Sequence, residues 1–402
     1  MSLLRNRHLL TLALAHFTSD TYSNMLPILW PVFMVTFSLD YAMVGFATAC
    51  YTMAGSLTQP FFGYLGEKHG SRWLGAFGVG WVAICISATA LAPGYPWLVA
   101  LCLLAGVGSG AYHPQGALNS TLISGRRAGL GMAIFMVGGN LGYALGPVVA
   151  AVALTTALGL HAVPFLVVPG LLLAGWLFRL LGAVDKERAR IMVRRVSPAA
   201  VGPRAPLLAM VLVIFTIIVR GWSEMGVIIY LPLLYKARGL DLGLVSQLLF
   251  AMLVVEAGSG LVGGALSDRL ERRWVLAGAF LVIGPAILAF AYVPALPPLA
   301  ALALAGLGIG ATVPVTTVMG QELLPRNLGV ASGLVQGISF VASGLGVFLT
   351  GILADHLGLE TAFLALGLLP FAGFFVSFLL PRARRERFAL EGVPLPAERQ
   401  AL

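Results

Sequence analysis

The chain has 402 residues, of which 59% are hydrophobic and only 10% are charged, and its formal net charge is +9. Soluble domains carry roughly 25% charged residues, so this composition excludes an ordinary soluble protein. The apolar residues gather in long blocks, each close to the ~20 residues that a helix needs to cross ~30 Å of hydrocarbon. The composition therefore predicts an all-α polytopic membrane protein.

Apolar runs separated by polar breaks predict twelve transmembrane helices in two sets of six. The first set is expected near residues 8–36, 41–65, 73–92, 96–123, 128–157 and 162–183. The second set is expected near residues 207–235, 242–266, 274–293, 297–322, 328–354 and 361–380. A long polar stretch separates the sets, so we expect an N-terminal half (1–184), a linker (185–206), a C-terminal half (207–381) and a tail (382–402).

The Lys and Arg residues fall almost entirely on one side of these spans when the N-terminus is placed inside. Basic loops stay in the cytoplasm, so we expect an integral protein of the cytoplasmic (inner) membrane with both termini in the cytoplasm. The same bias explains the positive charge without a nucleic-acid partner. The expected partners are the lipid bilayer and a small-molecule substrate, and we expect the protein to function as a monomer.

The two halves repeat each other with an offset of about 200 residues. The glycine-rich run Ala105–Ala111 matches Ala305–Ala311, and a proline follows each run, Pro114 in the first and Pro314 in the second. Small residues at this density allow helices to pack closely. Two pseudo-symmetric six-helix halves, with a substrate site near the midplane between them, are typical of secondary transporters.

The loop between the second and third spans has a distinctive pattern, with Gly63, Glu67, Lys68, Gly70 and Arg72. A second copy is formed by Gly264, Asp268 and Arg269. The pattern resembles the cytoplasmic gating motif of the major facilitator superfamily, although Glu67 stands where that family usually has Asp, and the resemblance covers essentially the whole chain. An acid beside a helix end and basic residues can latch two helices, and breaking that latch lets the halves rock. The alternative is that these charges only set the topology.

Three further runs carry a closer resemblance. They are His16-x-x-x-Asp20, Tyr112-His113-Pro114, and the fifth-span run with Gly138, Gly139, Asn140, Gly142, Gly146 and Pro147. These runs resemble the fosmidomycin resistance protein branch of the superfamily, although Gln115 stands where that branch often has an acid. The glycine run also resembles the helix-packing motif associated with antiport. The resemblance implies export of a small compound, such as an anionic phosphonate-type antibiotic or metabolite, with protons moving inward.

His16 and Asp20 lie one turn apart on the first span and therefore share a helix face. An ionisable group costs ~2.5–3.5 kcal/mol at the centre of a membrane helix, which favours a functional role for those that are present. Asp20 can hold His16 protonated, or exchange its own proton when its surroundings change. The alternative is a buried pair that only fixes helix packing.

Arg220 and Glu224 repeat this spacing on the seventh span. The planar guanidinium suits a carboxylate or a phosphonate, and such an anion could displace Glu224. The alternative is a purely structural pair within one helix. Trp222 lies between them in the sequence and is expected either to line the substrate pathway or to pack in the core.

Other polar residues within the spans extend the candidate substrate and proton pathway. Glu256 on the eighth span has no local partner and suits a proton carrier, because a neutral carboxyl is less costly to bury than a carboxylate. A partner from another helix would weaken that interpretation. His113 is interpreted as a substrate contact or titrating group, or else as a hydrogen-bonded core histidine. Neutral residues that could contribute to the pathway are Tyr112, Gln115, Asn140 and Gln336.

The motifs of several enzyme classes are missing from the chain. It has no Gly-Lys-Ser/Thr phosphate loop and no Cys/His cluster with zinc spacing, so no ATP hydrolysis, cofactor or metal is expected. The leading hypothesis is a secondary active transporter that works by alternating access and exports its substrate with proton coupling. The alternatives are proton-coupled uptake of a small carboxylate, an intramembrane acyltransferase with His16 and Asp20 as a base dyad, and a sensor that has lost transport.

Overall fold

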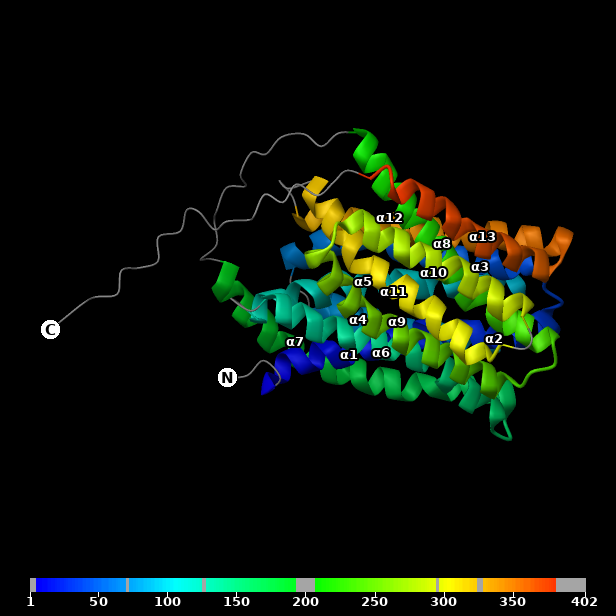
Figure 1. The fold of residues 1–402 in the computed structure, drawn as a ribbon. Coiled ribbons are helices and arrows are strands. Elements are labelled where there is room, and N and C mark those ends of the chain that lie inside the picture. The colour runs from blue at the N-terminus through cyan, green and yellow to red at the C-terminus, as the bar shows by residue number, and fades with distance from the viewer. Residues whose placement is uncertain are drawn as a thin grey trace.

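The computed structural model describes residues 5–69, 72–124, 128–192, 207–293, 296–323 and 328–380, and every regular element in these ranges is a helix. The long helices run along one common direction and form a single bundle (Figure 1). The N-terminal half contains α1 (Arg7–Ser23), α2 (Leu26–Phe37), α3 (Tyr41–His69), α4 (Arg72–Ala88), η2 (Thr89–Leu91), α5 (Tyr95–Ser124), α6 (Ala128–Thr155), η4 (Gly159–Leu166) and α7 (Val167–Met192). The C-terminal half contains α8 (Leu207–Ala237), α9 (Leu242–Arg269), α10 (Arg272–Tyr292), α11 (Pro298–Leu323), α12 (Leu328–Leu357) and α13 (Leu359–Ser377). The predicted all-α class is confirmed.

Within the described ranges, ten segments are long and apolar enough to cross a membrane. They comprise α4 with η2, η4 with α7, and the helices α5, α6 and α8 to α13. The remaining two predicted spans correspond to α3 and to α1 together with α2. Helix α7 also continues as far as Met192, beyond the half boundary expected at residue 184.

The first predicted span, 8–36, was wrong as one continuous helix. The structure ends α1 at Ser23 and begins α2 at Leu26. Pro27 lies in the first turn of α2 and has no N–H to donate to the carbonyl four residues earlier, that of Ser23. The missing hydrogen bond interrupts the helical ladder, so the span divides into two helices.

Glycines bring equivalent helices of the two halves into close contact. A Cβ atom on Gly106 of α5 would lie 2.2 Å from the backbone oxygen of Tyr51 on α3. A Cβ atom on Gly306 of α11 would lie 2.4 Å from the backbone oxygen of Met252 on α9. Neither position can accommodate a side chain, so α3 packs on α5 as α9 packs on α11. The glycine repeat seen in the sequence therefore makes the same kind of contact in both halves.

The two halves are joined at the end of the bundle where α3 begins and α12 ends, which we call the distal end. Here Asp355 accepts hydrogen bonds from the backbone N–H groups of Tyr41 and Ala42, each at 2.8 Å. Tyr230 of α8 donates to the Tyr41 carbonyl oxygen at 3.1 Å. A Cβ atom on Gly45 would lie 2.8 Å from the backbone of α12. The opposite end, where α1 begins and α13 ends, is called the proximal end.

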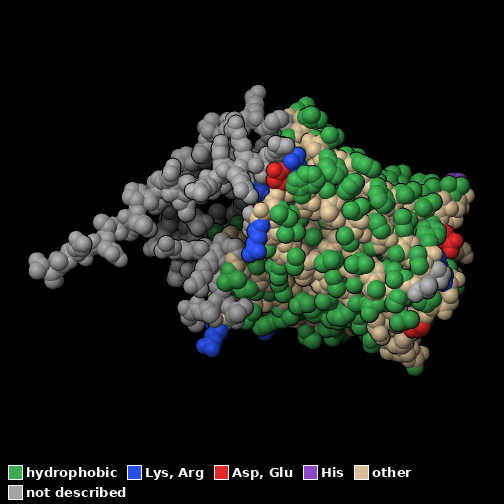
Figure 2. Space-filling model, viewed as in Figure 1, with side chains coloured by type: hydrophobic (Ala, Val, Ile, Leu, Met, Phe, Trp, Pro, Cys, Tyr) green, Lys and Arg blue, Asp and Glu red, His purple; other side chains and the backbone are tan. Residues whose placement is uncertain are grey.

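The side of the bundle is covered by hydrophobic side chains, whereas the visible acidic and basic side chains gather toward its two ends (Figure 2). The exposed apolar residues include Leu172 on α7, Leu261 on α9 and Phe375 on α13. Water would penalise so large an apolar surface, and lipid tails would not. The surface is therefore that of a protein that lies in a membrane.

Candidate functional site

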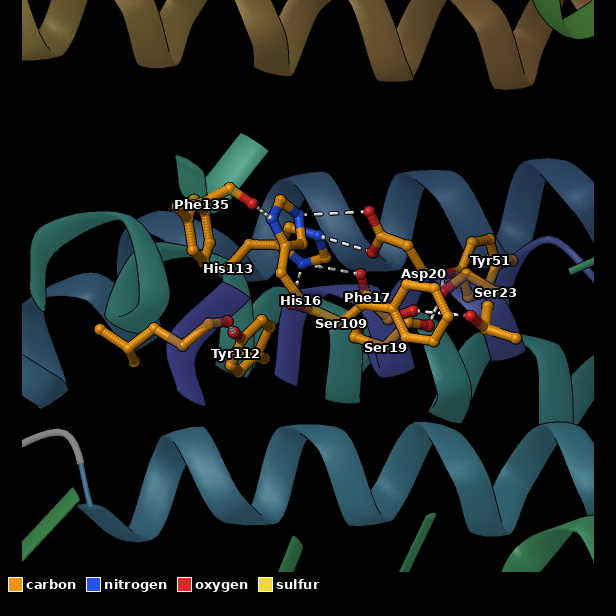
Figure 3. Close-up of polar contacts among 12 residues, drawn as sticks. His16, Phe17, Ser19, Asp20, Ser23, Tyr51, Ser109, Tyr112, His113 and Phe135 are labelled. Carbon is orange, nitrogen blue, oxygen red and sulfur yellow. Dashed lines mark hydrogen bonds and ion pairs between the residues drawn. The ribbon is translucent and has the colours of Figure 1, made fainter. Parts of the chain in front are cut away.

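The central feature of the N-terminal half is a triad formed by His16, Asp20 and His113, which we call the His–Asp–His triad (Figure 3). The Asp20 carboxylate lies 3.2 Å from Nε2 of His16, one turn away on α1, and 3.1 Å from Nε2 of His113 on α5. His16 is buried, while the Asp20 and His113 side chains keep 16% and 26% exposure. One ligand atom from each residue lies within 4.8 Å of the others, close enough to share protons or one small cation.

Backbone carbonyl groups hold the far side of both imidazole rings. Nδ1 of His16 lies 2.9 Å from the carbonyl oxygen of Phe135, and the two rings are stacked with their centroids 4.1 Å apart. Nδ1 of His113 lies 2.8 Å from the carbonyl oxygen of Ser109, one turn earlier on α5. These contacts orient both Nε2 atoms toward Asp20.

The glycine run of α6 packs against α1 and makes room for this arrangement. A Cβ atom on Gly138 would lie 2.2 Å from the Ala13 carbonyl oxygen, and one on Gly139 would lie 2.3 Å from the His16 ring. The same close approach continues along the helix at Gly142, which faces Phe17, and at Gly146, which faces Thr21; Pro147 follows within α6. A side chain at these positions would push α6 away from α1 and from the triad.

Three predicted pathway residues of α5 and α6 do not contact Asp20. The Tyr112 hydroxyl is buried and donates to the carbonyl oxygen of Leu12 at 2.7 Å, which fixes α5 against α1. Gln115 is also buried and donates to the carbonyl oxygen of Phe62 on α3 at 2.7 Å. Asn140 is exposed. Helix packing thus uses Tyr112 and Gln115 as contacts between helices of the N-terminal half.

The C-terminal half contains a second charged group of residues, Arg220, Glu224 and Glu256, which we call the Arg–Glu cluster. The guanidinium of Arg220 donates to the Glu224 carboxylate and to the hydroxyl of Ser339 on α12. Glu256 of α9 lies beside Glu224 and Arg220, and its Oε2 atom is buried with no hydrogen-bond partner among the described residues. Glu256 therefore has partners from another helix, which the sequence could not show. The cluster brings two acids to one arginine.

Trp222 packs in the interior. Its Nε1 donates to Thr350 of α12 at 2.9 Å, and its ring occupies the space that a Cβ atom on Gly346 would need. Both contacts are with α12, so Trp222 packs between α8 and α12, and a place for it in the substrate pathway stays a prediction. The Gln336 side chain, expected to lie near this helix pair, falls outside the described residues.

Two tyrosines near the triad were not singled out by the sequence. The Tyr51 hydroxyl of α3 donates to Ser23 at 2.5 Å and lies beside Ser109 and Asp20. Tyr143 of α6 is partly buried, and the charges that act on its hydroxyl come from both halves: Asp20 of the triad, and Glu224 and Glu256 of the Arg–Glu cluster. Its hydroxyl lies 3.8 Å from Sδ of Met225. No spacing in the sequence distinguishes these tyrosines from aromatic residues of the core.

The predicted gating motifs are described in part. A Cβ atom on Gly63 would contact Pro114 at 3.7 Å, and one on Gly264 would contact Pro314 at 3.8 Å, so the two motif copies occupy equivalent places. Arg72 donates to the Phe178 carbonyl oxygen on α7 at 2.8 Å, and Lys68 and Arg269 are exposed. Gly70 and the side chains of Glu67 and Asp268 lie outside the described residues, so the latch stays a prediction.

The chain is similar in sequence to known transporters. The family model for the Major Facilitator Superfamily matches residues 12–254 and 213–398. The Fosmidomycin resistance protein of Escherichia coli (strain K12) is 28% identical over 377 residues, which cover 92% of this chain and 91% of that protein. The MFS-type transporter YfnC of Bacillus subtilis (strain 168) is 26% identical over 390 residues, 94% of each protein. The multidrug efflux pump Tap of Mycobacterium tuberculosis (strain ATCC 25618 / H37Rv) is 34% identical over 144 residues, 34% of each protein.

Solved structures of transporters share the fold. A bacterial homologue of the human lysosomal transporter Spinster, in an inward-facing and occupied conformation, superposes with a TM-score of 0.78 at 15% identity and covers 94% of this chain and 97% of its own. A D-xylose–proton symporter superposes with a TM-score of 0.72 at 14% identity, with the same coverage. The chain belongs to the major facilitator superfamily, and it is a transporter rather than an enzyme.

Proposed function

We propose that this transporter exports a small compound from the cytoplasm across the inner membrane in exchange for protons, by alternating access of its two halves. The observation that carries the proposal is the His–Asp–His triad, in which one membrane-embedded carboxyl contacts two imidazoles from different helices. Ionisable groups inside a membrane are costly and commonly form proton relays. All three side chains can take up and release protons.

The direction of transport is supported by the names of the relatives, and the closure of the bundle is compatible with it. Two of the relatives are a drug resistance protein and a multidrug efflux pump. The Lys and Arg pattern assigns the proximal end to the cytoplasm, and the halves are joined at the distal end through Asp355 and Tyr41. The structure is therefore closed at the end opposite the cytoplasm, as an exporter must be when it takes up its substrate from the cytoplasm.

The Arg–Glu cluster is proposed to recognise an anionic group on the substrate. The planar guanidinium of Arg220 offers paired donors that suit a carboxylate or a phosphonate. Glu224 and Ser339 accept hydrogen bonds from these donors, and the buried Oε2 atom of Glu256 has no hydrogen-bond partner among the described residues. A substrate anion would replace Glu224 on the guanidinium. The substrate site would then lie in the C-terminal half, and the proton site would lie in the N-terminal half.

A second candidate is uptake of a small carboxylate together with protons. The observation that favours it is the presence of two acids beside the single guanidinium of Arg220. Protonation of one acid would release the guanidinium for the substrate, so proton and anion would bind together. Export by exchange and uptake by symport therefore predict opposite signs of proton movement relative to the substrate.

The test is to measure the pH inside proteoliposomes that are loaded with candidate substrates, phosphonates and small carboxylates first. Exchange predicts that the interior acidifies as substrate leaves, and symport predicts that it becomes alkaline. Glu360→Gln is a matched control because Glu360 is an exposed carboxyl at the distal end, in an ion pair with Arg238. Substrate movement without any proton movement would contradict proton coupling.

A further inference from the structure

We propose that the His–Asp–His triad is a binding site for two protons in the conformation that the structure shows. Its role in transport rests on the proposed function, but the count of two protons rests on the geometry of the triad alone. That count depends on which ring nitrogen of each histidine carries hydrogen, because the other nitrogen then faces Asp20.

The hydrogen on His16 is placed by Phe135. A backbone carbonyl oxygen only accepts hydrogen bonds, so Nδ1 of His16, at 2.9 Å from the Phe135 oxygen, must carry a hydrogen. A neutral imidazole has only one N–H group, so a neutral His16 would present a bare lone pair at Nε2. That lone pair would face a carboxylate oxygen of Asp20 at 3.2 Å, which is a contact between two acceptors.

His113 is constrained in the same way from α5. Its Nδ1 lies 2.8 Å from the Ser109 carbonyl oxygen and 3.2 Å from the Ser109 hydroxyl. A bare Nδ1 could accept from the hydroxyl but would face the carbonyl oxygen, which only accepts, at the shorter distance, so we place hydrogen on Nδ1. Nε2 of His113 then faces the other carboxylate oxygen of Asp20 at 3.1 Å. Figure 3 shows both rings aimed at the same carboxylate from different helices.

Each of the two contacts with Asp20 needs one hydrogen to become a hydrogen bond. Asp20 can contribute at most one, because a carboxylic acid carries a single O–H group. At least one imidazole must therefore be doubly protonated, and the second hydrogen lies either on the other imidazole or on Asp20. Both arrangements contain two protons more than the triad of neutral histidines and carboxylate, and both carry a net charge of +1.

The described surroundings provide no further ionised group at these contacts. The ionisable neighbours are Tyr51 of α3, Tyr112 of α5 and Tyr143 of α6. Tyr112 donates to Leu12 and Tyr51 donates to Ser23, so neither hydroxyl proton is directed at Asp20. The carboxylates of the Arg–Glu cluster lie beside Arg220. Within the described residues, the two hydrogens must therefore come from protons bound by the triad.

Loss of either proton has a direct structural consequence. A carboxylate and a bare nitrogen lone pair would then face each other at about 3 Å in a medium of low dielectric constant. The affected contact must then open. Opening of the contact between His113 on α5 and Asp20 on α1 moves these two helices relative to each other. Transport of two protons in each cycle would follow if both contacts open in the other conformation.

The deciding experiment is nitrogen NMR of the full-length protein in lipid nanodiscs, with 15N-labelled histidine and 13C-labelled aspartate. The chain has six histidines, so His16→Gln and His113→Gln identify the two signals, and His161→Gln, at an exposed site in η4, is the control. We expect hydrogen on both Nδ1 atoms and two further protons shared among the two Nε2 atoms and the Asp20 carboxyl. Asp20→Asn is expected to remove the imidazolium signal from at least one ring.

Three results would overturn the proposal. One is a pair of neutral rings, the second is a proton at only one of the two contacts, and the third is a metal ion on the Nε2 atoms that EDTA removes. The measurement needs no substrate, so its outcome is independent of the proposed function. Two protons on the triad without any substrate-driven proton flux would support the two-proton site and contradict proton-coupled export.

Discussion

The carboxylate of Asp355, near the end of α12, caps the first turn of α3 through two hydrogen bonds, one of them to the backbone N–H of Tyr41 at 2.8 Å. The two residues belong to different halves, so the cap joins the halves where they meet at the distal end. In the proposed alternating-access cycle, outward opening would break the cap, because α3 and α12 would have to separate there. Its strength therefore contributes to the balance between the two conformations.

Asp355→Ala is expected to shift this balance toward the outward-open state. Loss of an N-cap costs about 0.5–2 kcal/mol, which corresponds to a change of roughly 2- to 30-fold in the ratio of the states. Electron-paramagnetic-resonance distances between spin labels at Leu158 and Leu357, exposed at the distal end on the two halves, would measure the shift. Asp241→Ala is the matched control, since Asp241 caps α9 within a single half. Equal shifts in both variants would contradict the role of Asp355.

Asp20→Asn is expected to abolish proton-driven accumulation while substrate binding and exchange persist. An amide does not bind a proton at physiological pH, and its NH2 group cannot accept a hydrogen bond from a second imidazole as a carboxylate oxygen does. Counterflow of labelled substrate, compared with uphill transport under an imposed pH gradient, would separate the two activities. Normal uphill transport by the variant would remove Asp20 from the coupling role.

Arg220→Lys is expected to weaken binding of a planar anion by about 10- to 100-fold, because an ammonium cannot reproduce the paired donors of the guanidinium. Ser339→Ala removes the other contact of the same guanidinium and is expected to have a smaller effect. Direct binding measurements on purified protein would compare the variants. Unchanged affinity in Arg220→Lys would make Arg220 a structural residue.

Gly142→Ala is expected to destabilise the N-terminal half. The new Cβ atom would lie 2.0 Å from the Phe17 carbonyl oxygen, so α6 must move away from α1. Overpacking of this kind costs about 1–3 kcal/mol. Gly278→Ala on α10 is the control, because no atom of the described part of the chain lies within 4 Å of its added Cβ atom. Thermal unfolding in detergent should show a lower midpoint for Gly142→Ala alone.

The local parts of the candidate site could be predicted from the sequence. His16 and Asp20, like Arg220 and Glu224, are four residues apart, and a helix places such residues side by side whatever surrounds it. Their contacts in the structure follow this rule. The break between α1 and α2 at Pro27 is also a local effect. It was not predicted because the apolar run of the first span continues on both sides of Pro27.

Contacts between helices could not be predicted in this way. His113 contacts Asp20, whereas Gln115, two residues later on the same helix, contacts Phe62. Trp222 lies between Arg220 and Glu224 in the sequence, but its side chain packs against α12. Which partner each side chain contacts depends on how its helix is rotated about the helix axis. Helices that are apolar on nearly every face carry little information about that rotation.

The sequence by itself determined the membrane class, the spans and the two-fold repeat, because a bilayer requires long apolar helices and leaves charge at their ends. Only the tertiary structure decided that His113 completes the triad, that Glu256 joins Glu224, and that Tyr143 of α6 contacts Met225 of α8 in the other half. These contacts depend on which helix faces meet, and close packing at glycines such as Gly139 and Gly310 sets those faces. Residues far apart in the chain can form one site because that packing fixes their positions.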